Sequence, residues 1–166
     1  MRIDKDYKGL IDEGYRYKIE GDIITTESLV IDLNKGLYVT GCIEADGDIK
    51  SGWSIEAGWF IKAGGSIKAG RSIEAGEYIE AGGSIEAGRN IKSGEDIEAC
   101  GYIKAGWSIK ANGSIKAKGD IKSYGVVNHG ILKELGLPEE SDDKTEDKTE
   151  DAMKLLKEKG YRIIKV

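Results

Sequence analysis

The side chains that most often carry out catalysis are scarce in this sequence and stand far apart. The chain contains one histidine, His129, and two cysteines, Cys42 and Cys100, in 166 residues. A general base must lie within hydrogen-bond reach of the group that it deprotonates, in a concave site. Two cysteines and one distant histidine also lack the spacing of a zinc site. We therefore predict no enzymatic activity, no metal and no cofactor.

Tryptophan and arginine, in contrast, show a regular spacing that suits binding. Each residue of one series stands eighteen positions from the next: Trp53, Arg71, Arg89 and Trp107. Arginine over the face of tryptophan forms a cation–π pair, and both residue types dominate the energetic centres of protein interfaces. Two interpretations stay open, a ladder that stabilises the chain's own structure or a ridge that binds a protein partner.

The Trp/Arg series lies within a six-residue repeat, whose strands must hold these side chains in place. Alanine or serine stands two residues after each isoleucine of the repeat, with lysine or glutamate between them. Alternate side chains of a strand face opposite ways, so isoleucine and alanine enter a core while the charge faces water. Isoleucine recurs fourteen times at an unbroken interval of six: Ile43, Ile49, Ile55, Ile61, Ile67, Ile73, Ile79, Ile85, Ile91, Ile97, Ile103, Ile109, Ile115 and Ile121.

Each short strand must end in a corner, because continued alternation would bury charged residues such as Arg71 and Glu77 without partners. We place the corner at the glycine after alanine, where a positive φ is accessible. The residues two before each isoleucine separate into distinct columns only at a period of eighteen, so three strands complete one turn of a triangular coil. One column is entirely glycine: Gly47, Gly65, Gly83, Gly101 and Gly119.

The predicted fold class is therefore all-β, a single-stranded parallel β-helix, for which a right-handed coil is favoured. Residues 1–30 are predicted to form an N-terminal cap and residues 31–127 the solenoid of hexapeptide repeats. Residues 128–151 should hold a short helix that begins at His129, followed by an acidic linker. Residues 152–166 should form a helix and a strand, which make a small C-terminal α/β cap.

The coil also sets expectations for residues outside the strict repeat and for the cysteines. The pairs Ile31/Leu33 and Leu37/Val39 are expected to continue the inward-facing positions upstream. Cys42 and Cys100 lie more than three turns apart, about 15 Å along the axis. That distance exceeds the reach of a disulfide, so both thiols are predicted to be unpaired.

The Ile-x-Ala-Gly-x-x step resembles that of two known families. Hexapeptide acyltransferases also build triangular prisms, but there the small inward residue precedes the aliphatic one, and the coil is left-handed. The order in this chain is more similar to that of bactofilins, as in GDIKSG at residues 47–52. The resemblance covers residues 31–127 and implies a right-handed solenoid that polymerises, although the hexad here is stricter than in bactofilins. An acyltransferase would need a histidine and a loop within the coil, and no insertion interrupts residues 43–123.

Charge narrows the choice of partner. The net charge is −5, and residues 139–151 hold eight acidic residues against two lysines. The negative total and the mixed faces disfavour nucleic acid as a partner. Neither a membrane-spanning apolar run nor a secretory signal is apparent, so we expect a cytoplasmic protein with no membrane partner.

Our leading hypothesis is a stiff, non-enzymatic module that binds a protein partner, as a small inhibitor or adaptor. The alternative is a bactofilin-like, self-assembling structural protein, and a homo-oligomer is compatible with both. A hexapeptide-type acyltransferase is the least favoured function. Three aromatic residues are expected on the edge next to the Trp/Arg series, which gives these predicted protein-binding residues: Trp53, Trp59, Phe60, Arg71, Tyr78, Arg89 and Trp107.

Overall fold

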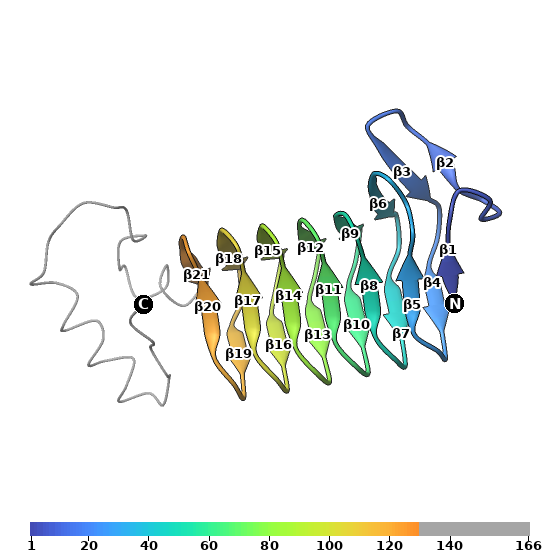
Figure 1. Ribbon diagram of the computed structural model, residues 1–166. Helices are drawn as coiled ribbons and strands as arrows, with labels where there is room; N and C mark the ends of the chain where they lie inside the picture. Colours follow the sequence, from blue (N-terminus) through green and yellow to red (C-terminus); the bar gives the residue numbers. More distant parts are fainter. Residues whose placement is uncertain (130–166) are drawn as a thin grey trace, which may run out of the picture.

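Three parallel sheets, wound from one chain, form the body of the protein. The computed structural model describes residues 1–129. In this part the chain is an all-β solenoid of about 6 turns (Figure 1), which confirms the predicted fold class. From β3 onward, successive strands along the chain alternate among sheets B, C and A in turn, and each strand pairs in parallel with the strand one turn away.

The strands of the repeat are short and uniform. Sheet A contains β1 (Arg2–Ile3), β5 (Leu29–Ile31), β8 (Ile49–Ser51), β11 (Ile67–Ala69), β14 (Ile85–Ala87), β17 (Ile103–Ala105) and β20 (Ile121–Ser123). Sheet B contains β2 (Ile11–Asp12), β3 (Arg16–Ile19), β6 (Gly36–Val39), β9 (Ile55–Ala57), β12 (Ile73–Ala75), β15 (Asn90–Ser93), β18 (Ser108–Ala111) and β21 (Val127–His129). Sheet C contains β4 (Ile23–Thr25), β7 (Ile43–Ala45), β10 (Ile61–Ala63), β13 (Ile79–Ala81), β16 (Ile97–Ala99) and β19 (Ile115–Ala117).

The core is a column of stacked isoleucines along each sheet. Ile61 pairs with Ile43 on one side and with Ile79 on the other, which is the predicted step of eighteen residues. These three side chains have no solvent exposure. Burial of one such side chain contributes about 1.5–3 kcal/mol, so the column is the main source of stability.

The glycines of the repeat serve a purpose that differs from the predicted one. Positive φ angles occur in residues 1–129 only at Gly9, Gly14 and Gly21, all of which precede the repeat. The glycine after each alanine instead allows close stacking, because a Cβ atom on Gly76 would overlap the carbonyl oxygen of Gly58 one turn earlier. The expectation of a left-handed corner was therefore wrong.

Side-chain oxygens satisfy backbone N–H groups at the corner between sheets C and A. The Ser66 N–H donates to Asp48 Oδ1 at 2.8 Å, and the Ser84 N–H donates to Ser66 Oγ at 3.1 Å. A Cβ atom on Gly83 would overlap Ser66 Oγ, which explains why this column contains only glycine. The all-glycine column is thus a steric requirement of a corner whose half-buried N–H donors need partners.

The first turns differ from the prediction in register. Leu29, not Ile31, aligns with Ile49, and Ile31 aligns with Ser51. Ile31 and Leu33 are both buried, as expected, but their predicted register was wrong, because this turn is two residues longer than the eighteen-residue turns of the repeat. Leu37 and Val39 do align with Ile55 and Ala57 as expected. Parallel pairing already begins with β1, β3 and β4, all upstream of residue 31.

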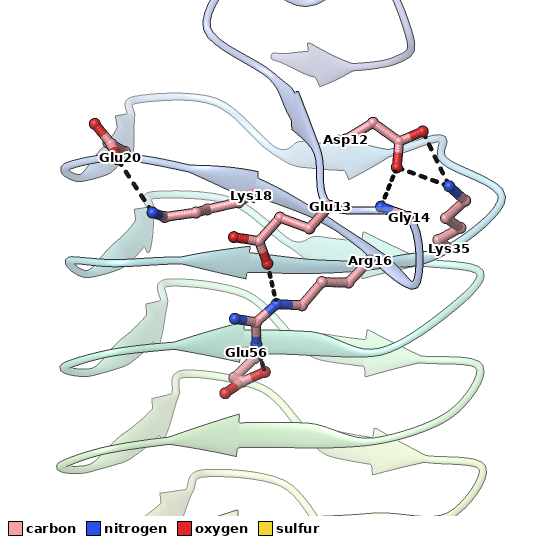
Figure 2. Close-up of polar contacts among 8 residues, drawn as sticks. All are labelled: Asp12, Glu13, Gly14, Arg16, Lys18, Glu20, Lys35 and Glu56. Carbon is pink, nitrogen blue, oxygen red and sulfur yellow. Dashed lines mark hydrogen bonds and ion pairs between the residues drawn. The ribbon is translucent and has the colours of Figure 1, made fainter.

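A hairpin closes the N-terminal end of sheet B. Strand β2 pairs antiparallel with β3, and polar contacts fix the hairpin to the coil (Figure 2). Asp12 accepts from Lys35 Nζ at 2.8 Å, and Arg16 donates to Glu13 at 2.8 Å and to Glu56 at 3.1 Å. The Arg16 guanidinium also lies 4.2 Å from the centre of the Tyr38 ring.

At the other end of the described chain, β21 continues sheet B through His129. His129 therefore ends a strand and does not begin the predicted helix. The predicted acidic linker and the helix and strand of residues 152–166 lie outside the described residues.

Replacement of Gly76 by Ala should lower the free energy of unfolding by about 1–3 kcal/mol, because the new methyl group must displace stacked backbone. The matched control is Gly52→Ala, since a Cβ atom at Gly52 meets nothing within 4 Å. That control should change stability by less than about 0.5 kcal/mol. Urea denaturation followed by circular dichroism measures both variants, and equal effects would contradict the close-stacking explanation.

Candidate protein-binding edges

Four residues stack on the corner between sheets A and B. We call this set the Trp–Arg ridge: Trp53, Arg71, Arg89 and Trp107. The Arg89 N–H donates to the Arg71 carbonyl at 2.9 Å, and the Trp107 N–H donates to the Arg89 carbonyl at 2.8 Å. The corners therefore lie directly over one another, and their side chains are neighbours.

The predicted cation–π pairs are present on this ridge. The Arg71 guanidinium carbon lies 4.0 Å from the centre of the Trp53 ring, and that of Arg89 lies 5.0 Å from the Trp107 ring. Each pair is worth about 0.5–1 kcal/mol at an exposed site. Trp107 is 58% exposed, so stacking leaves much of its surface open to a partner.

Among the described residues, the two guanidinium groups have no carboxylate partner. Within residues 1–129, neither Arg71 nor Arg89 forms an ion pair or a side-chain hydrogen bond. A guanidinium carries five N–H donors in a planar fork, and stacking on an indole occupies its face but not these donors. The ridge therefore presents two neighbouring positive charges whose hydrogen-bonding capacity is unused inside the described fold.

The next corner, between sheets B and C, carries aromatic and acidic residues. We call this set the aromatic–acidic edge: Trp59, Phe60, Glu77, Tyr78 and Glu95. The Phe60 and Tyr78 rings are stacked at 4.8 Å between centroids and are inclined by 5°. The Glu77 N–H donates to the Trp59 carbonyl, and the Glu95 N–H donates to the Glu77 carbonyl, both at 2.8 Å. Trp59 is 57% exposed.

A hollow of about 190 Å³ lies beside the aromatic–acidic edge. Its lining is Tyr78, Ile79, Glu80, Glu95, Asp96 and Glu98. Burial raises the pKa of the Tyr78 hydroxyl, so that this group stays protonated. The Ser114 backbone N–H donates to Asp96 at 2.6 Å and holds the pKa of that carboxyl below its usual value. The hollow is therefore negatively charged at neutral pH.

The seven predicted binding residues thus fall on two neighbouring corners and do not form one continuous ridge. Sheet B separates the Trp–Arg ridge from Trp59, Phe60 and Tyr78. No role was predicted for Glu77 and Glu95, although they stand eighteen and thirty-six residues after Trp59. The hollow was not predicted, because its lining combines corner and strand residues from two turns.

A second, broader hollow of about 680 Å³ lies between sheets C and A, near the C-terminal end of the described coil. Its charged lining is mainly basic, with Lys104, Lys118 and Lys122. Lys122 pairs with Asp120 at 2.7 Å. In residues 1–129, no group of three or more histidine, cysteine or carboxylate side chains is placed to hold a metal ion.

Comparisons of the chain with models of known protein families, with curated proteins and with solved structures found no match. The geometry defines the class of the protein as a parallel β-solenoid with about 18 residues per turn. The described part of the chain contains no helix long and apolar enough to cross a lipid bilayer.

Both cysteines are unpaired, as predicted, and they differ in environment. Cys100 is exposed, whereas Cys42 is buried with 4% exposure. Burial, with a further contribution from Asp22, raises the pKa of the Cys42 thiol to about 11.

The Cys42 thiol should therefore react slowly with Ellman's reagent at pH 8. A pKa raised from 9.0 to about 11 lowers the thiolate fraction about 100-fold, and burial adds a steric barrier. The fast phase of the reaction with the reagent belongs to the exposed Cys100 thiol. It should therefore persist in Cys42→Ser and disappear in Cys100→Ser, and the reverse result would contradict the buried position of Cys42.

The folded chain holds the proton of the Cys42 thiol more tightly than the unfolded chain. The free energy of unfolding should therefore fall as the pH rises from about 9 towards about 11.

Proposed function

We propose that this chain is a non-enzymatic, cytoplasmic binding module that recognises another protein through the Trp–Arg ridge, as an inhibitor or adaptor. The observation that carries the proposal is the pair of guanidinium groups, Arg71 and Arg89, each stacked on an indole and without an acidic partner in residues 1–129. Two free thiols are in keeping with a reducing compartment.

The physical basis is preorganisation. Binding normally immobilises long side chains at a cost of about 0.5–1.5 kcal/mol each. On the ridge, stacking has already restricted both arginines, and the parallel sheets hold the corners at a fixed spacing. A partner that supplies carboxylates meets donors that are ordered in advance, and exposed Trp107 adds apolar contact area.

One observation favours a second candidate, a bactofilin-like structural protein that assembles end to end. At the N-terminal end, sheet A terminates in β1 and sheet C terminates in β4, and within residues 1–129 each of these strands pairs with a single neighbour. Edge strands of this kind offer backbone groups to another chain. In sheet B, the antiparallel strand β2 covers the corresponding edge of β3.

The double variant Trp53→Ala/Trp107→Ala should lose affinity for its protein partner by about tenfold or more, because it removes both aromatic platforms of the ridge. The measurement is affinity capture from a lysate of cells that express the chain, with quantification of each captured protein by mass spectrometry. Circular dichroism should show an unchanged fold, since both side chains lie outside the isoleucine core.

The matched control is Tyr102→Ala, an exposed aromatic residue on the corner between sheets C and A. This variant should capture the same proteins as the parent chain. If the ridge variant and the parent retain the same proteins in equal amounts, the ridge is not the binding surface and the proposal fails.

A further inference from the structure

The Trp–Arg ridge and the aromatic–acidic edge are built on the same period and carry opposite charge. The four ridge residues occur at steps of eighteen, and so do the residues of the other edge that stand six positions later: Trp59, Glu77, Glu95 and Gly113. Backbone hydrogen bonds of 2.8–2.9 Å join successive members from Arg71 to Trp107 on one edge and from Trp59 to Gly113 on the other. Both rows of side chains therefore repeat at the rung spacing of about 4.8 Å.

In the part of the chain that the structure describes, the acidic row lacks side-chain partners in the same way as the basic row. Within residues 1–129, neither the Glu77 nor the Glu95 carboxylate forms an ion pair or a side-chain hydrogen bond. The hollow of about 190 Å³ beside Glu95 also contains the carboxylates of Glu80, Asp96 and Glu98. A hollow of this size accommodates the planar end of an arginine side chain, and the exposed face of Trp59 borders the same corner.

We propose that the Trp–Arg ridge of one copy of this chain docks along the aromatic–acidic edge of a second copy. This inference rests on the proposed role of the ridge as the binding surface and names its partner. Because the two rows share one spacing, an Arg71–Glu77 contact between copies brings Arg89 to Glu95 at the next rung. Trp53 then meets Trp59, and Trp107 meets Gly113, which has no side chain to obstruct the indole.

If the coils of the two copies run in opposite directions, the same charges still pair, with Arg71 at Glu95 and Arg89 at Glu77. In both directions each edge offers two like charges on adjacent rungs, and contact with the other edge neutralises them. A second copy presents the two carboxylates of its aromatic–acidic edge at the same spacing as the two guanidinium groups, and its sheets carry lysines as well as glutamates. A uniform polyanion such as nucleic acid lacks this mixture of charges and is repelled by the acidic corner of the first copy, one sheet away from its ridge.

The two docking surfaces differ, so the contact is heterologous. Each added copy leaves one ridge and one acidic edge unoccupied, and assembly continues as a row of parallel coils or closes into a ring. A contact along a corner buries a small area, so association should be weak and dependent on concentration. Salt should weaken it further, because exposed charges are screened.

Charge reversal tests the inference directly. Sedimentation of the full chain over a concentration series should reveal self-association that weakens by about tenfold or more in Arg71→Glu/Arg89→Glu and equally in Glu77→Arg/Glu95→Arg. A mixture of these two variants should associate again, and the variant with all four changes should regain the parent's affinity. The control matched to Arg71→Glu/Arg89→Glu is Lys5→Glu/Lys8→Glu, which makes the same change in charge away from both edges and should behave as the parent.

A parent chain that sediments as a monomer at every concentration would overturn the inference. Self-association that is indifferent to both charge reversals would also overturn it, and would indicate end-to-end contact of the coils instead. In either case the ridge still functions as proposed if the capture of a different protein depends on Trp53 and Trp107. Loss of that dependence as well would reject the proposed function.

Discussion

The constraint on which the structure depends is the in-register stacking of identical isoleucines, one turn above another. Ile43, Ile61 and Ile79 occupy equivalent positions on successive turns of sheet C, and all three are fully buried. A turn length that is not a multiple of six would place charged residues of the hexad opposite apolar ones and remove apolar surface from the core. The core is narrow, so each turn has few other contacts that could compensate for this loss of buried apolar surface. The regularity of the corners follows from that of the core.

Close stacking of the corners extends this regularity to the surface side chains. Glycine after alanine lets the backbone of one turn approach the carbonyl oxygen of the turn before it, as at Gly76 and Gly58. The next residue of each corner then lies over its equivalent, which brings the guanidinium of Arg71 to 4.0 Å from the Trp53 ring. The same geometry aligns Glu77 with Glu95 on the neighbouring corner. A single packing rule therefore generates two rows of opposite charge, on either side of sheet B.

The sequence predicted the features that follow from period alone. The turn length, the isoleucine core and the Arg–Trp contacts are direct consequences of a hexad repeated in threes. It did not predict the reason for the glycines, because a requirement for space and a requirement for positive φ select the same residue. The alignment of Leu29 with Ile49 was also missed, since the pattern of apolar residues at 29, 31 and 33 allows two registers that differ by two residues. The hollow beside Tyr78 depends on side chains from different turns, which no local pattern specifies.

Disulfide formation between introduced cysteines measures the turn length in solution. In a Cys42→Ser/Cys100→Ser background, Lys62→Cys/Glu80→Cys places thiols on residues that are direct partners in adjacent strands. Neighbouring strands lie about 4.8 Å apart, which is within disulfide reach, so this pair should oxidise readily. The pair Lys62→Cys/Glu86→Cys occupies equivalent outward positions of the hexad but spans one strand more, and it should remain reduced. Oxidation of the second pair and not of the first would contradict the three-sided coil, because it would require four strands per turn.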